Sequence, residues 1–312
     1  MTSPLSFTDA MGRNRDGLLP AAFAGRPVCV VVGNFDGVHI AHQRLLSKGK
    51  ETGLPVVALT FDPHPRKVLC GTAPARLSDN GTRDELLRRF GADAIVLLAF
   101  SKDFADMSAE AFVRDILVAR LHAGALVFGH DFKLGKDGTG DAASLQALGN
   151  RYRFAARQLD RVQLDDGTVI SSTAVRAAVA KGNMERAERL LGRRYELRGN
   201  VVHGAHRGRG LGFPTANIDI HPSIQLPAPG VYATDACFDG RRYRAATNVG
   251  TNPTFHNPMP TVETHIPDFH GNLYGTSLRV EFKTKLRDET AFDSIDALKI
   301  QLASDVRKAE RL

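Results

Sequence analysis

The chain has 312 residues, of which 43% are hydrophobic and 24% charged, so it has the composition of a globular protein with one large domain or two ordinary ones. Its longest apolar stretch, at 94–100, is too short to cross a bilayer, and the charged residues between positions 9 and 16 argue against a signal peptide. Its three cysteines, Cys29, Cys70 and Cys237, are too far apart for a disulfide framework or a zinc cluster and predict a reducing compartment, the cytoplasm.

Up to about residue 190, short apolar runs alternate with helical patterns. This alternation is typical of parallel strands joined by crossover helices and predicts a doubly wound α/β domain. Strands are expected at 28–32, 56–61, 94–100 and 125–128, and helices at 42–48, 82–90 and 109–121.

A segment rich in glycine and histidine follows the first expected strand and opens a helix. In such folds ligands bind at the carboxyl ends of strands, where helix N-termini offer N–H groups to phosphate. His39 and His42 are three residues apart, so they share one helix face and can both point toward the anion. A metal bound by the His pair is the alternative, but zinc usually needs three or four protein ligands, and no HExxH or CxxC motif is present.

The segment from Gly33 to His42 closely resembles the GxFDGxHxGH motif of prokaryotic FAD synthetases, a branch of the HxGH nucleotidyltransferases, with Ala41 where the family has Gly. Three further segments are similar to family motifs: 60–65 to TFxPHP, 129–135 to GxDFxFG with Leu134 in place of an aromatic residue, and 170–176 to ISSTxxR.

This resemblance implies adenylyl transfer from ATP to FMN, with His39, His42 and Arg176 stabilising the phosphates. It implies that Asp62 and His64 bind FMN. The residues that it implies for ATP binding are Gly33, Asn34, Phe35, Asp36, Gly37, His39, His42, Asp131, Ser172, Thr173 and Arg176.

After Gly192 the pattern changes to that of antiparallel strands. Period-2 alternation at 231–238 and 241–249 flanks Asp239-Gly240, a strong hairpin signal, and a further strand is expected at 277–283. A helical pattern at 293–311 closes the chain, so a small antiparallel β-barrel with a C-terminal helix is predicted. We therefore expect two domains, 1–186 and 187–312.

Much of the formal net charge of +7 lies between Lys181 and Arg209, where eight Lys or Arg face three Asp or Glu. One interpretation is attraction of a polyanion, either nucleic acid or nucleotide phosphates. The other is a solvated helix face, since residues 184–189 mix both signs at helical spacing.

A second segment, from Gly204 to Asn217, joins a loop rich in Gly and Arg to the start of a strand. Successive glycines allow backbone N–H groups to surround phosphates. Thr215 and Asn217 are two residues apart, so on an extended segment they face the same way, and their oxygen atoms suit Mg²⁺. A flexible turn, in which Thr and Asn satisfy only backbone groups, is the alternative.

Residues 211–217 match the LGFPTAN motif of riboflavin kinases, and four later segments resemble that family's GVYA (230–233), NxGxxPTF (248–255), VETH (262–265) and LRxExxF (286–292) motifs. The resemblance implies that Glu263 is the general base and that Glu263 and Arg287 contact the flavin. It also implies that Mg²⁺ and ATP are held by Gly208, Gly210, Gly212, Thr215 and Asn217, with Thr215 and Asn217 as the magnesium ligands.

The two resemblances together span about 19–312 and predict a bifunctional enzyme that makes FMN from riboflavin and FAD from FMN, with ATP and Mg²⁺ at both steps. The expected partners are small molecules, with no nucleic acid and no membrane. An RNA-binding protein is one alternative, weakened by 7% aromatic residues with no Trp. A kinase whose nucleotidyltransferase half has become a flavin-binding module is the other, favoured only by Ala41.

Overall fold

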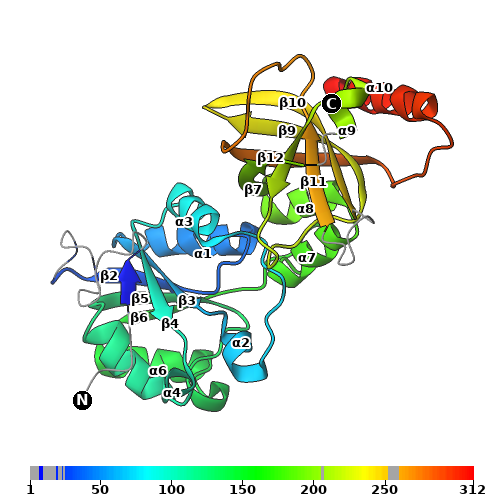
Figure 1. The fold of residues 1–312 in the computed structure, drawn as a ribbon. Coiled ribbons are helices and arrows are strands. Elements are labelled where there is room, and N and C mark those ends of the chain that lie inside the picture. The colour runs from blue at the N-terminus through cyan, green and yellow to red at the C-terminus, as the bar shows by residue number, and fades with distance from the viewer. Residues whose placement is uncertain (1–6, 10–18, 20–22, 24, 205–206, 252–259) are drawn as a thin grey trace. The chain divides into compact units, whose positions relative to one another are not determined.

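The computed structural model describes residues 7–9, 19, 23, 25–204, 207–251 and 260–312, which form two compact units (Figure 1). The first unit contains the chain up to Pro74 together with Asp79–Ser171, and the second contains Ala75–Ser78 together with Ser172–Leu312. Most of the charged segment near the N-terminus, residues 10–18, lies outside the described residues.

The first unit is built on a six-stranded sheet in the order β1-β4-β3-β2-β5-β6. The five strands from β4 to β6 are parallel, and β1 pairs antiparallel with β4 at the edge. This confirms the predicted parallel α/β sheet. The strands are β1 (Phe7–Asp9), β2 (Val28–Val32), β3 (Val56–Asp62), β4 (Ala94–Ala99), β5 (Ala123–Gly129) and β6 (Ala155–Leu159).

Helices cover both faces of this sheet, with α1 and α3 on one side and α4 and α6 on the other (Figure 1). Successive residues of β2 alternate between the two cores: Val28, Val30 and Val32 belong to one, whereas Cys29 and Val31 belong to the other. The fully buried Cys29 is therefore a core residue. The helices are α1 (Ile40–Lys50), α2 (Pro65–Cys70), α3 (Asn80–Arg89), α4 (Lys102–Ala105), α5 (Ala109–Phe112), the π-helix η2 (Val113–Val118), the 3₁₀-helix η3 (Lys136–Gly138) and α6 (Ala142–Tyr152).

The strand order fixes where a ligand can bind in this unit. From β2 the chain continues to β3 and β4 on one side, and then returns to β5 and β6 on the other side of β2. Such a reversal leaves a crevice at the carboxyl ends of the two strands where the order changes. The loops that follow β2 and β5 flank this crevice, and the loop that follows β3 is their neighbour.

The second unit is a closed barrel with the strand order β10-β11-β8-β7-β12-β9, and all six pairings are antiparallel. The turn between β9 and β10 has positive φ angles at Asp239 (48°) and Gly240 (72°), which confirms the predicted hairpin. The strands are β7 (Tyr195–Val202), β8 (Thr215–Asp219), β9 (Gly230–Phe238), β10 (Arg241–Thr251), β11 (Pro260–His265) and β12 (Ser277–Arg287).

Four helices accompany the barrel: α7 (Ser172–Ala180), α8 (Met184–Leu191), α9 (Arg207–Leu211) and α10 (Ile295–Arg311). Helix α8 contacts β7 and β12 and buries Met184, Ala187, Leu190 and Leu191, so it has a packed face as well as the solvated one considered above. The C-terminal helix predicted at 293–311 is α10, and it packs on β9 and β10.

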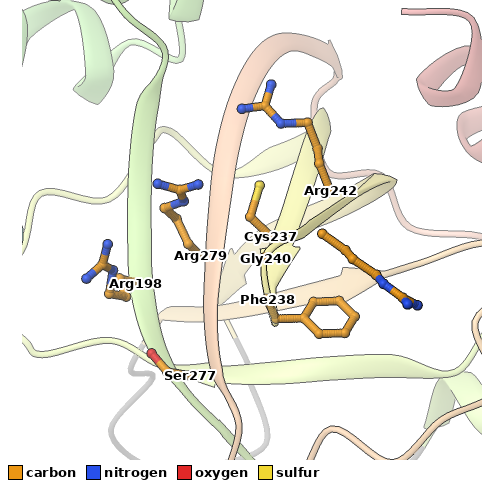
Figure 2. Close-up of a pocket in the computed structure, with 8 residues that line it drawn as sticks. Arg198, Cys237, Phe238, Gly240, Arg242, Ser277 and Arg279 are labelled. Atoms are coloured by element: carbon orange, nitrogen blue, oxygen red, sulfur yellow. The ribbon is translucent and has the colours of Figure 1, made fainter.

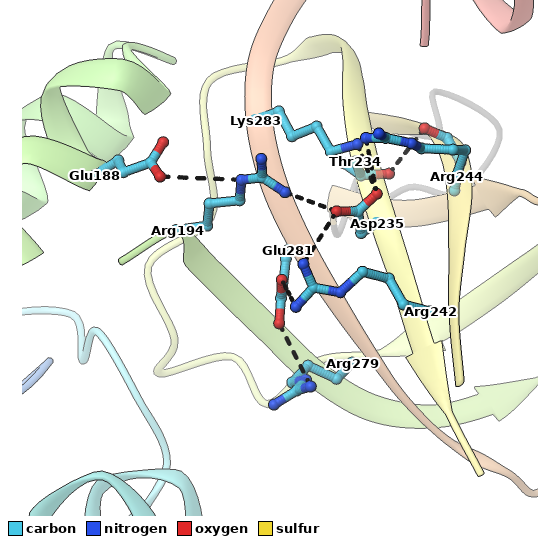
Figure 3. Close-up of polar contacts among 10 residues, drawn as sticks. Glu188, Arg194, Thr234, Asp235, Arg242, Arg244, Arg279, Glu281 and Lys283 are labelled. Atoms are coloured by element: carbon cyan, nitrogen blue, oxygen red, sulfur yellow. Dashed lines mark hydrogen bonds and ion pairs between the residues drawn. The ribbon is translucent and has the colours of Figure 1, made fainter. Parts of the chain in front are cut away.

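A cluster of charges lies on the outer surface of the barrel around Asp235, which is 2% exposed (Figure 3). Its carboxylate lies 2.6 Å from Lys283 Nζ and 2.7 Å from Arg194 Nη1. Arg242 and Arg244 lie 3.5 and 3.6 Å away. Burial lowers the pKa of Lys283, and the Asp235 carboxylate opposes that shift. Asp235 therefore supplies the counter-charge of a buried ammonium.

We expect Asp235→Asn to reduce the free energy of unfolding by about 3 kcal/mol, because it leaves the buried Lys283 ammonium without a counter-charge. Chemical denaturation followed by circular dichroism measures the change. Asp288→Asn is the matched control: this carboxylate also contacts a lysine, Lys285, but is 86% exposed, so little change is expected. Equal losses in the two variants would contradict the role assigned to Asp235.

Candidate active sites

The loop after β2 is held in a conformation that directs it toward the crevice of the first unit. Phe35, Gly37 and Val38 have positive φ angles of 52°, 75° and 40°, and the Phe35 and Val38 side chains are fully buried. Burial thus offsets the strain of two non-glycine residues in the left-handed region. The hydroxyl of Thr60, on the neighbouring strand β3, donates a hydrogen bond to the carbonyl of Asn34 at 3.2 Å.

His39 and His42 lie side by side at the N-terminus of α1. Their rings are stacked with centroids 3.6 Å apart, which confirms that they share one face, and the Phe35 ring packs edge-on against His42. His39 is 5% exposed, whereas His42 is half-buried. Two imidazoles at a helix N-terminus next to a glycine-containing loop form a suitable cradle for phosphate.

The two other motifs of this unit follow neighbouring strands. Asp62 ends β3 and is exposed, and His64 caps α2, with Nδ1 accepting a hydrogen bond from the backbone N–H of Arg66 at 3.2 Å. Asp131 follows β5, and its side chain is 83% exposed. Because β3, β2 and β5 are adjacent and parallel, Asp62, His39 and Asp131 all lie on the side of the sheet where these strands have their carboxyl ends.

Ser172, Thr173 and Arg176 lie on the first two turns of α7, in the second unit. The Arg176 guanidinium donates a hydrogen bond to the Thr173 hydroxyl at 3.4 Å. The Ser/Thr and Arg side chains are therefore brought together, as the motif predicted, at a helix N-terminus that suits an anion.

A row of polar side chains crosses three strands of the barrel. In the strand register, Glu263 on β11 is paired with Asn217 on β8 and with Asn248 on β10. The Thr215 hydroxyl donates a hydrogen bond to Glu263 Oε2 at 3.3 Å. Thr215 and Asn217 are half-buried and alternate with the buried Ala216, which confirms that they face the same way. The structure thus brings together the three residues assigned to magnesium, ATP and base catalysis.

The glycines before β8 allow the chain to pass close to these side chains. A Cβ atom at Gly204 would overlap the Asn217 amide, and one at Gly208 would overlap the carbonyl of Phe213. Gly208 and Gly210 lie in the short helix α9 rather than in the expected open loop, and Gly212 has a φ of 87°. Residues 205–206 of the predicted Gly/Arg-rich loop lie outside the described residues.

A cavity of about 330 Å³ opens beside Thr215 and Asn217. This volume falls in the range of pockets that bind small molecules. Its far wall comes from the segment between β11 and β12, and it includes Phe269, Asn272, Leu273 and Tyr274.

Sequence reasoning named Asn248 only as part of a motif and gave it no role. Its pairing with Glu263 was not deducible before the register of β10 and β11 was known. Glu289 is another residue to which the sequence analysis assigned no role. Its carboxylate lies where a Cβ atom of Gly250 would be, so it borders the end of β10 that also carries Asn248. Residues 252–255 of the 248–255 motif lie outside the described residues.

Arg287, expected to contact the flavin, is held mainly by α10. Its Nε donates a hydrogen bond to Asp305 Oδ2 at 2.9 Å, and Asp305 is 1% exposed. Nη1 donates to the carbonyl of Asp288 at 2.9 Å, and the guanidinium lies over the Phe292 ring. These contacts fix the guanidinium in one orientation at the end of β12.

No helix of the described residues is long and apolar enough to span a membrane. Two family models match the chain, one described as FAD synthetase over residues 24–174 and one described as riboflavin kinase over residues 191–312.

Similar proteins cover nearly the whole chain. A Haemophilus influenzae protein named bifunctional riboflavin kinase/FMN adenylyltransferase is 39% identical, over 90% of this chain and 92% of its own length. The Escherichia coli K12 protein of the same name is 37% identical, over 89% and 90%. A crystal structure from Streptococcus pneumoniae, described as a macrolide-efflux protein, has a TM-score of 0.86 and 33% identity, over 93% of this chain and 95% of that one.

Proposed function

The chain belongs to the family of bifunctional riboflavin kinase/FMN adenylyltransferases, and on that premise we propose which residues take part in each of the two reactions. The enzyme phosphorylates riboflavin with ATP to give FMN, and then transfers the adenylyl group of a second ATP to FMN to give FAD and pyrophosphate. One observation supports the division most directly: the pair of His39 and His42 follows β2 of the parallel sheet, whereas Thr215, Asn217 and Glu263 lie on strands of the barrel.

In the kinase reaction we assign Glu263 the role of general base. A ribityl hydroxyl is a weak nucleophile, so a carboxylate that accepts its proton helps it to attack the γ-phosphate of ATP. Thr215 donates a hydrogen bond to this carboxylate and fixes its orientation. The glycines of α9 and of the turn after it, Gly208, Gly210 and Gly212, leave room for the phosphates.

The donors next to Glu263 fit magnesium. Thr215 supplies a hydroxyl oxygen and Asn217 an amide oxygen, and both face Glu263 across adjacent strands. These are the hard oxygen ligands that Mg²⁺ takes together with nucleotide phosphates. When bound, the ion would neutralise charge on the transferred phosphoryl group. We propose that Thr215 and Asn217 hold it, and that Mg²⁺ also accompanies ATP at the adenylyltransferase site.

Adenylyl transfer needs no general base, because the FMN phosphate is already an anionic nucleophile. Here His39 and His42 would stabilise the charge that develops on the ATP phosphates, and Arg176 would add a fixed positive charge. By the resemblance to the FAD synthetase motifs, we also propose a role in ATP binding for Gly33, Asn34, Phe35, Asp36, Gly37, Asp131, Ser172 and Thr173. Asp62 and His64, at the end of the neighbouring strand β3, are the proposed FMN contacts, and Arg287 is the proposed flavin contact of the kinase site.

We propose the cytoplasm as the compartment, because the three cysteines are free thiols. The Streptococcus pneumoniae protein is described as a macrolide-efflux protein, and we do not assign that activity to this chain.

The proposal is tested by incubating the protein with riboflavin, ATP and Mg²⁺ and separating the flavins by chromatography. We expect FMN to accumulate first and FAD to follow, with one pyrophosphate released per FAD. If FMN forms but FAD never does, even from supplied FMN, the adenylyltransferase assignment is wrong.

The proposed domain boundary at 186/187 allows a test by dissection. We expect a fragment of residues 1–186 to convert FMN to FAD, and a fragment of residues 187–312 to phosphorylate riboflavin. The cut divides α8, which begins at Met184, so the second fragment should be less stable than one of residues 182–312 by about 2–3 kcal/mol, the contribution of one buried side chain. Inactivity of all three fragments, despite folded circular dichroism spectra, would contradict two separable domains.

Ala41 permits a finer test of the adenylyltransferase site. It lies in the first turn of α1 between His39 and His42, where the FAD synthetase motif has Gly. We expect Ala41→Gly to lower the KM for ATP in FAD formation, because it removes one methyl group from the cradle, although Gly disfavours the helix by roughly 1 kcal/mol. Riboflavin phosphorylation should be unchanged. Steady-state kinetics of both reactions tests this expectation. An unchanged or raised KM for ATP in FAD formation would mean that the site is adapted to Ala.

A further inference from the structure

A second cavity, of about 390 Å³, lies on the outer surface of the barrel, and neither proposed reaction uses it (Figure 2). Four arginines line it, and no carboxylate of the described residues does. The lining residues are Arg198, Cys237, Phe238, Gly240, Arg241, Arg242, Ser277 and Arg279.

Strand pairing places three of these arginines in a single row. Arg198 on β7 is directly opposite Arg279 on β12, Arg279 is opposite Cys237 on β9, and Cys237 is opposite Arg242 on β10. Cys237, a small side chain, lies between Arg279 and Arg242 (Figure 2). Like charges opposite each other on adjacent strands are destabilising, so negative charge next to this row would stabilise it.

Negative charge borders the row on one side. Two residues along each strand, Glu196, Glu281 and Asp235 form a parallel row. Glu281 lies 2.9 Å from Arg242 and 3.4 Å from Arg279, which anchors both guanidinium groups (Figure 3).

The carboxylate row has other cations to neutralise as well. Asp235 also contacts Arg194, Arg244 and Lys283, so it is shared among several positive groups. On the opposite side of the arginine row lies the cavity, with the Ser277 hydroxyl and Arg241 at its rim. Arg241 is exposed and forms no ion pair with any described residue.

The cavity is separate from the kinase site. Arg242 lies six residues before Asn248 on β10, which corresponds to about 20 Å of extended strand. The two positions lie toward opposite ends of the same strand.

We propose that this cavity binds a condensed phosphate, either free pyrophosphate or the polyphosphate chain of a nucleotide. Guanidinium groups bind phosphate oxygens through paired, charge-assisted hydrogen bonds, and four arginines and one hydroxyl line this cavity. A pocket of this volume lined by four arginines suits a compact, multiply charged anion rather than an extended nucleic-acid strand. The inference rests on the geometry of the barrel and is independent of the catalytic assignments.

The test uses the full-length protein and isothermal titration calorimetry with three probes: sodium pyrophosphate, a non-hydrolysable ATP analogue, and a short single-stranded DNA. The pocket variant is Arg198→Gln with Arg241→Gln, which leaves the contacts of Asp235 and Glu281 intact. The matched control is Arg88→Gln with Arg89→Gln, two exposed arginines of α3 in the first unit. It removes the same charge from a different surface. Arg241→Gln alone, at the exposed first residue of β10, serves if the double variant does not fold.

We expect the pocket variant to weaken one binding event by about tenfold or more, because it removes charge-assisted hydrogen bonds, while the control binds as the unmodified protein does. An effect on pyrophosphate would identify the free anion as sufficient, and an effect confined to the ATP analogue would identify the nucleotide. Both catalytic activities should be unchanged. Identical isotherms for all three proteins would overturn the proposal, and so would a loss seen only with DNA.

Discussion

Glu263→Gln is expected to slow riboflavin phosphorylation by about a thousandfold, and to leave the adenylylation of supplied FMN unchanged. Gln has the shape of Glu and can still accept the hydrogen bond from Thr215, but it cannot take a proton from the ribityl hydroxyl. The loss should appear in kcat, with little change in the KM for ATP, because the magnesium donors Thr215 and Asn217 are intact.

Glu185→Gln is the matched control for this variant. It makes the same chemical change at an exposed position of α8, and both activities should be retained. Rates are measured by chromatography of FMN and FAD with saturating ATP. If Glu263→Gln lowers both activities equally while the control lowers neither, Glu263 has a structural role or the two sites are coupled.

His42→Ala is expected to reduce FAD formation from FMN by about a hundredfold to a thousandfold, and to leave riboflavin phosphorylation unchanged. The imidazole stacks on His39 at the N-terminus of α1, and its loss removes one of the groups that would stabilise charge on the ATP phosphates. Because that charge increases as the adenylyl group is transferred, the effect should fall on kcat more than on KM.

Arg44→Ala is the control on the same helix. Arg44 is exposed and lies two residues beyond His42, which places it on the other side of α1. Its loss removes a positive charge close to the site without touching the His pair, so FAD formation should be retained. A loss of similar size in both variants would indicate a general effect of charge and would remove the specific role of His42.

The interior of the first unit could be predicted from sequence because burial determines it. Strands β2 to β5 are buried apolar runs, and their expected bounds differ from the observed ones by at most two residues. The edge strand β6 (Ala155–Leu159) has no such run, since it has no fully buried residue. It therefore escaped prediction.

Helical periodicity also has a limit at residues 109–121, where one helix was expected. The structure has α5 followed by the π-helix η2, in which the N–H groups of Ala119 and Leu121 donate to the carbonyls of Arg114 and Ile116, five residues earlier. Apolar spacing alone does not distinguish a short π-helix from an α-helix, because both bury the same stretch of apolar residues.

The site residues were predictable where chemistry depends on local spacing. His39 with His42, and Thr215 with Asn217, were expected on shared faces, and both pairs are found so. The row of Arg198, Arg279 and Arg242 could not be predicted. Its members lie on different strands of the barrel, and only the pairing register brings them together.

The central claim is that one chain carries two independent active sites, and mixing the two inactivated variants tests it most directly. Neither Glu263→Gln nor His42→Ala alone should make appreciable FAD from riboflavin, ATP and Mg²⁺, since each lacks one step. Mixed in equal amounts, they should restore FAD formation: His42→Ala supplies FMN, and Glu263→Gln adenylylates it after diffusion through solution. Absence of FAD from the mixture, when each variant still performs its remaining half-reaction, would contradict two independent sites.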